Sequence, residues 1–213
     1  MSELATIRRA YRYIVAYERR VLDAISQIDE VARDADFERN QPQRWWPLYR
    51  NATSRDWAPD KSAWNSIPVY ACRYRWMSGE HNVIGTRYLL LDHVADTDFE
   101  QQMLTTPNLE LEPLDGLAAP EKSRSILRWF LIELTGPLTT QQWKDYWPDI
   151  LAKQVSQPAV DLLLKAPTDS PRSYTGKSLR FTSACVDLET LDSPDSLKTL
   201  VLDPLRTALA QPA

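Results

Sequence analysis

Residues 125–134 read SILRWFLIEL, and this stretch decides the fold. Side chains of a β-strand point alternately to the two faces of a sheet. Here both alternating sets are mainly apolar, with Arg128 and Glu133 as the polar interruptions. A short run that is apolar on both faces is typical of a strand covered on both sides. The stretch therefore predicts a central strand of a sheet.

Strand-like stretches lie on both sides of this central strand. Residues 69–77 alternate, and one face carries Tyr70, Cys72, Tyr74 and Trp76. Residues 78–82, SGEHN, are a hairpin-length connection containing glycine, so we predict that residues 83–92 form the partner strand. Residues 178–188, SLRFTSACVDL, are predicted to form a further strand.

Residues 4–32 are predicted to form one long helix, because apolar side chains recur at alternating spacings of three and four. This spacing also fits a coiled-coil seam, but Glu18 interrupts the seam and Tyr17 and Leu22 widen the apolar stripe. We therefore expect packing within one monomer, and at most a weak homodimer. The side chains expected against the strands are Ile7, Ile14, Val21 and Ile28.

Further helices are predicted over residues 139–154 and 158–165 and after Ser193, where Pro194 fits a first helical position. Pro204 is expected to kink or split that last helix. Together these elements predict an α+β fold: a mixed or antiparallel sheet of about four or more strands, with a long N-terminal helix and further helices mainly on one face. We expect one domain over residues 1–213, with an irregular aromatic-rich excursion at 33–68 and an acidic loop region at 93–121.

The composition of the 213 residues is that of an ordinary globular protein, with 43% hydrophobic and 25% charged residues. No apolar run approaches the ~20 residues that span a bilayer, and the first residues lack the apolar core of a signal peptide. The two cysteines lie far apart in the sequence and form no disulfide framework. We therefore expect a cytoplasmic protein without a membrane partner.

Charge is distributed unevenly along the chain. Residues 39–90 carry 8 basic and 3 acidic groups, whereas residues 91–121 carry 8 acidic and no basic groups. Either the two stretches neutralise each other in the fold, or the basic stretch forms a face for an anionic partner.

No recognised catalytic or cofactor-binding motif occurs, so we expect no cofactor and name no enzymatic activity. The densest group of potential metal ligands is Asp92, His93, Asp96 and Asp98. Oxygen ligands of this kind suit a hard cation, which makes a metal-dependent enzyme one hypothesis. The alternative interpretation is an acidic, solvated loop that leaves a strand.

Aromatic and basic side chains are concentrated between residues 45 and 76. They fit a second small core, a protein-binding surface or a stacking platform for nucleic acid. We favour a protein partner over nucleic acid, since the net charge is −4. The predicted partner-binding residues are Trp45, Trp46, Tyr49, Arg50, Trp57 and Trp64.

The alternative site for a nucleic acid or nucleotide is a basic sheet face formed by Arg73, Arg75 and Arg87. The overall expectation is a non-catalytic intracellular binding protein that associates stoichiometrically with a macromolecule. In general type the chain is similar to bacterial accessory proteins such as toxin-immunity, chaperone or defence-associated proteins. That similarity implies no role for any particular residue.

Overall fold

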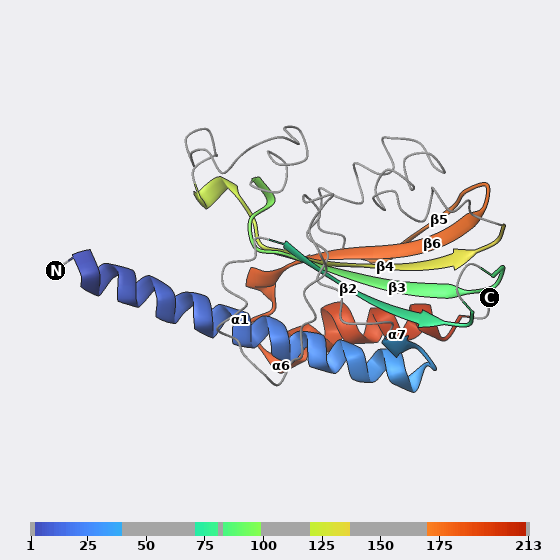
Figure 1. The fold of residues 1–213 in the computed structure, drawn as a ribbon, viewed down its shortest axis with the longest axis horizontal. Helices are drawn as coiled ribbons and strands as arrows, with labels where there is room; N and C mark the ends of the chain where they lie inside the picture. The colour runs from blue at the N-terminus through green and yellow to red at the C-terminus, as the bar shows by residue number, and fades with distance from the viewer. Residues whose placement is uncertain (1–2, 40–70, 81–82, 99–119, 137–169, 212–213) are drawn as a thin grey trace.

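The computed structural model describes residues 3–39, 71–80, 83–98, 120–136 and 170–211 (Figure 1). The chain begins with helix α1 (Glu3–Asp34), followed by strands β1 (Glu38–Arg39), β2 (Ala71–Ser78) and β3 (Arg87–Val94). A short 3₁₀ helix, η2 (Pro120–Lys122), precedes β4 (Ile126–Leu134), β5 (Arg172–Thr175) and β6 (Leu179–Asp187). The last elements are η3 (Leu188–Thr190), α6 (Pro194–Leu197), η4 (Lys198–Leu202) and α7 (Asp203–Leu209).

The described strands form one six-stranded sheet in the order β1-β2-β3-β4-β6-β5. Every pairing in it is antiparallel. The α+β prediction is thus confirmed. Strand β4, the SILRWFLIEL stretch, lies between β3 and β6, and eight of its nine residues are buried, as the apolar run on both faces predicts.

Helices α1, α6 and α7 lie on one face of the sheet, with α1 and α7 side by side beneath the strands (Figure 1). A buried apolar cluster of the described residues joins α1, the sheet and the C-terminal helices. Its α1 members are Val21, Ala24, Ile25, Ile28, Val31 and Ala32. The C-terminal half of α1 therefore packs against the sheet of its own chain, as predicted.

The N-terminal half of α1 does not follow this prediction. Ile7 is 46% exposed and Ile14 is half-buried, so neither reaches the strands as expected. Figure 1 gives the reason: α1 is longer than the face of the sheet that it covers, and its first turns extend past the end of the strands. None of the helices described combines the length and hydropathy of a membrane span.

The hairpin between β2 and β3 is longer than predicted. Residues 83–86 belong to the connection, and β3 begins only at Arg87. Gly85 has φ +88, a conformation that side-chain-bearing residues rarely adopt, and the Thr86 hydroxyl donates to the carbonyl of Glu80. Turn geometry thus overrides the apolar pair Val83-Ile84, whose side chains are exposed.

The C-terminal helical stretch begins where the sequence predicts, and it changes from α-helical to π-helical geometry before Pro204. The Ser193 hydroxyl accepts from the Ser196 amide at 3.1 Å, and the Ser196 hydroxyl accepts from the Ser193 amide at 3.1 Å, a reciprocal cap. Pro204 is preceded by the π-helical segment η4, in which the Asp203 amide donates to the Lys198 carbonyl. Because proline has no N–H and its ring crowds the preceding turn, the wider turn accommodates it.

Candidate functional site

The predicted aromatic partner-binding residues lie outside the described part of the chain. These are Trp45, Trp46, Tyr49, Arg50, Trp57 and Trp64. The predicted helices over residues 139–154 and 158–165 also lie outside it.

The predicted basic sheet face is wrong, because the strand register separates its members. Arg75 pairs with Leu90 and Arg73 with Asp92, whereas Arg87 pairs with Ser78. Directly paired residues share a face, and successive residues alternate. Arg87 therefore lies on the helix-covered face, and Arg73 and Arg75 occupy positions on the other.

The surroundings of Arg75 and Arg87 lower the pKa values of both guanidinium groups. Burial lowers the pKa of Arg75, and the nearby Tyr88 opposes this effect. Burial also lowers the pKa of Arg87, while Glu133 raises it and Arg180 lowers it. Sequence reasoning could not have found this difference, since it depends on where β3 begins.

The predicted metal ligands do not form one site. Asp92 and His93 are neighbours on β3 and so face opposite sides of the sheet. Asp92 forms a buried ion pair with Arg128, at 3.1 Å between Oδ2 and Nε. His93 instead shares a 2.7 Å hydrogen bond, through Nε2, with the hydroxyl of Tyr17 in α1.

The other two predicted ligands make local contacts where the chain leaves β3. Asp96 accepts hydrogen bonds from the Ser123 hydroxyl at 2.5 Å and from the Asp98 amide at 3.0 Å. Within the described residues, no group of three or more His, Cys, Asp or Glu side chains could hold a metal ion. Asp96 and Asp98 thus help to join the end of β3 to the segment before β4.

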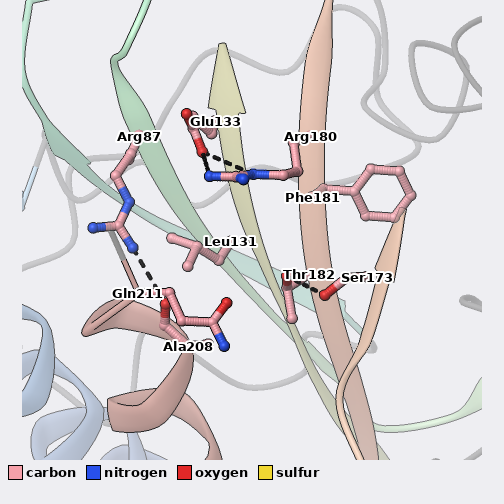
Figure 2. A pocket seen from close by; sticks show the side chains of 9 residues that line it. All are labelled: Arg87, Leu131, Glu133, Ser173, Arg180, Phe181, Thr182, Ala208 and Gln211. Carbon is pink, nitrogen blue, oxygen red and sulfur yellow. Dashed lines mark hydrogen bonds and ion pairs between the residues drawn. The ribbon is translucent and has the colours of Figure 1, made fainter. Parts of the chain in front are cut away.

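A pocket of about 180 Å³ lies where α7 ends against the sheet (Figure 2). Arg87, Glu133 and Arg180 form one row across β3, β4 and β6. Arg180 donates from Nε to a Glu133 carboxylate oxygen at 3.0 Å and from Nη2 to the same oxygen. The next row contributes the Ser173 and Thr182 hydroxyls, which lie 2.8 Å apart.

Within this pocket, Arg87 connects the sheet to the end of α7. Its Nη2 donates to the backbone carbonyls of Ala208 at 3.3 Å and Leu209 at 3.0 Å, and its guanidinium lies 5.3 Å from the centre of the Phe37 ring. The last carbonyls of a helix have no partner within the helix, so a cation there is doubly favourable. The charged groups of the pocket thus make internal contacts, and Arg87 is the one that links the sheet to the end of α7.

The strongest candidate for external contact is the start of α1. We call residues 3–16 the N-terminal arm; at about 1.5 Å per residue it is roughly 21 Å long. Leu4 is 64% exposed, Ile7 46% and Tyr13 69%. Tyr17, which follows the arm, contacts the sheet through His93 and packs against the core.

The arm is also basic. It contains three arginines, Arg8, Arg9 and Arg12, and one acidic residue, Glu3, for a net charge of +2. All three arginines are exposed. An exposed helix segment that combines apolar and basic side chains is typical of an interaction surface. The 3-and-4 spacing of apolar residues indicates the stripe in the sequence, but it does not indicate where along α1 the sheet ends.

One protein-family comparison covers most of the chain: the sequence model of the PM0109 family matches residues 2–201. The chain belongs to the PM0109 family. No curated protein and no solved structure matches it.

The PM0109 match includes the whole N-terminal arm and every described strand. The surface and the pocket described above therefore lie within the PM0109 region, apart from the α7 end that Arg87 contacts. The match supplies no activity or partner, so the function of this PM0109 member rests on its own residues.

Proposed function

We propose that the protein acts by stoichiometric association with a protein partner, and that the apolar stripe of the N-terminal arm, which includes Leu4 and Ile7, is the contact surface. This places the function in the class of non-catalytic binding proteins, in keeping with a bacterial accessory, immunity or defence-associated role. Cytoplasmic residence is part of the proposal and is supported by the scarcity of cysteine.

One observation carries the proposal: the apolar stripe of α1 extends past the end of the sheet, so the sheet leaves the N-terminal part of the stripe uncovered. Leu4 and Ile7 are exposed on this stripe, whereas Ile25 is only 3% exposed. Each Leu or Ile side chain that a partner buried fully would contribute about 1.5–3 kcal/mol. That is enough for the arm to contain the centre of a small interface, with the arginines at its rim.

The test is recovery of a partner from the native host with three forms of the full chain. Ile7→Asp places a charge on the exposed stripe. Ala16→Asp is the matched control, because Ala16 is exposed and nine residues, two and a half turns, further along α1, on the opposite side. We expect wild type and Ala16→Asp to retain the same protein at a fixed ratio, and Ile7→Asp to lose it.

A second variant tests the aromatic segment between residues 45 and 76. If Trp45→Ala/Trp46→Ala also loses the partner while folding normally, both surfaces belong to one interface. Equal recovery with wild type and Ile7→Asp would refute the arm as the contact surface.

A further inference from the structure

The direction of the apolar stripe limits the shape of what can bind to it. Ile7 and Ile25 are 18 residues apart, as are Ile14 and Ala32, and 18 residues are five helical turns. Members of each pair therefore point the same way. Ile25 and Ala32 are in the core beneath the sheet, so Ile7 and Ile14 face the side on which the sheet lies.

The arm extends past the end of the strands, and the sheet lies on the side of α1 to which Ile7 and Ile14 point, which we call the inner side of the arm (Figure 1). A flat bilayer cannot lie along the inner side of the arm, since the sheet extends from the same side of α1. A helix, about 10–12 Å in diameter with its side chains, is narrow enough to lie beside the arm. Its apolar residues at spacings of three and four would interdigitate with Leu4, Ile7 and Ile14.

The charges of the arm indicate the charge of that helix. Arg8 and Arg12 are four residues apart on one flank of the stripe, a like-charged pair that disfavours the free helix. Neither forms an ion pair with a described residue. Carboxylates opposite them would relieve the repulsion and desolvate no unpaired charge.

The same charges argue against a second copy of the chain as the occupant. Two arms placed together would oppose net charges of +2 and +2. Resting on the proposed function, and on these observations, we infer that the partner supplies an acidic amphipathic helix that packs along the inner side of the N-terminal arm.

Photo-crosslinking in the native host tests this inference with the full chain. Ala10 is exposed and lies between Ile7 and Ile14 along the helix, so a photoreactive benzoylphenylalanine at this position reports on the inner side of the arm. We expect mass spectrometry to identify a crosslinked segment of another protein. That segment should have a net negative charge and apolar residues spaced three and four apart.

Charge reversal gives the matched comparison. Arg8→Glu/Arg12→Glu should lower the crosslink yield on the order of tenfold, because attraction becomes repulsion at the rim. The control is Lys177→Glu/Lys198→Glu, which changes the net charge by the same amount. Both lysines are exposed, one in the turn before β6 and one in η4, so this variant should leave the crosslink yield unchanged.

A crosslinked segment that is neutral or basic, a second copy of the chain or a lipid would overturn the acidic-helix inference. Equal yields from the two charge-reversed variants would overturn it as well. In any of these cases, partner recovery that depends on Ile7 would leave the proposed function standing. If neither Ile7→Asp nor Arg8→Glu/Arg12→Glu reduced partner recovery, the proposed function itself would be refuted.

Discussion

Removing one member of the buried Asp92–Arg128 ion pair should be among the most destabilising single changes in the protein. The side chains of Asp92 and Arg128 are 5% and 2% exposed, and they lie on the middle strands β3 and β4. Asp92→Ala would leave the Arg128 guanidinium buried without this carboxylate. Removing one partner of a buried ion pair costs about 3–5 kcal/mol of unfolding free energy.

That cost translates into measurable shifts. With a urea m-value of about 3 kcal/mol/M, the unfolding midpoint should fall by about 1–1.7 M. The melting temperature should fall by roughly 6–20 °C for a chain of this size. Urea titration followed by circular dichroism measures the first effect, and calorimetry measures the second.

A double-mutant cycle separates the pair from the loss of packing. Asp92→Leu/Arg128→Leu removes both charges together, and it should be much less destabilising than the sum of its single changes. Asp23→Ala, at an exposed position of α1, is the control and should stay within about 0.5 kcal/mol of wild type. A cost below about 1 kcal/mol for Asp92→Ala would refute the view that this pair is held in a water-excluded part of the sheet.

Three further predictions test other contacts. Ile7→Asp should leave the melting temperature unchanged, whereas Ile25→Asp, at a stripe position that lies in the core, should prevent stable folding. Equal destabilisation by the two changes in thermal melts would contradict an exposed arm. Arg87→Met should cost about 1–3 kcal/mol and speed amide exchange in α7, because the carbonyls of Ala208 and Leu209 lose the Arg87 guanidinium as a donor; unchanged exchange in α7 would argue against this link. Trp76→Phe should cost about 1.5–3 kcal/mol in urea titration, since it removes the 2.6 Å bond from the indole N–H to the Asp29 carboxylate; a neutral effect would mean that the carboxylate is satisfied by Arg33 alone.

The central strand and the helix contacts of the fold could be predicted from local sequence, because they depend on periodicity. Strand β4 is apolar in both alternating sets, and α1 carries its stripe from Val21 onward into the core. The short strand β5 was not predicted, since its four residues, RSYT, have no apolar pattern and owe their state to pairing with β6.

The predicted sites failed for reasons that local sequence does not contain. Arg87 fell on the wrong face because the hairpin turn extends to Thr86, which shifts the start of β3. Asp92 and His93 were grouped as ligands although neighbouring residues of a strand face opposite sides of a sheet. Once the chain segment is known to be a strand, that separation follows without further information.

The arm's exposure was missed for a different reason. Its apolar spacing is the same as that of the buried half of α1, and the spacing alone does not say how far the sheet extends beneath a helix. The number of residues on the strands sets that distance, and it is fixed by pairing between segments far apart in the chain.

The polar strand β5 also determines how the sheet can meet other molecules on its side. Among the described strands it is the outermost one, next to β6. It spans only Arg172–Thr175 and leaves three of its four side chains exposed, one of them charged. Short, polar edge strands resist the addition of a strand from another chain, which is the usual route from a native sheet to fibrillar aggregates. The apolar sheet interior is therefore protected at this edge from templating growth, and high concentrations of the protein should remain free of cross-β assemblies nucleated there.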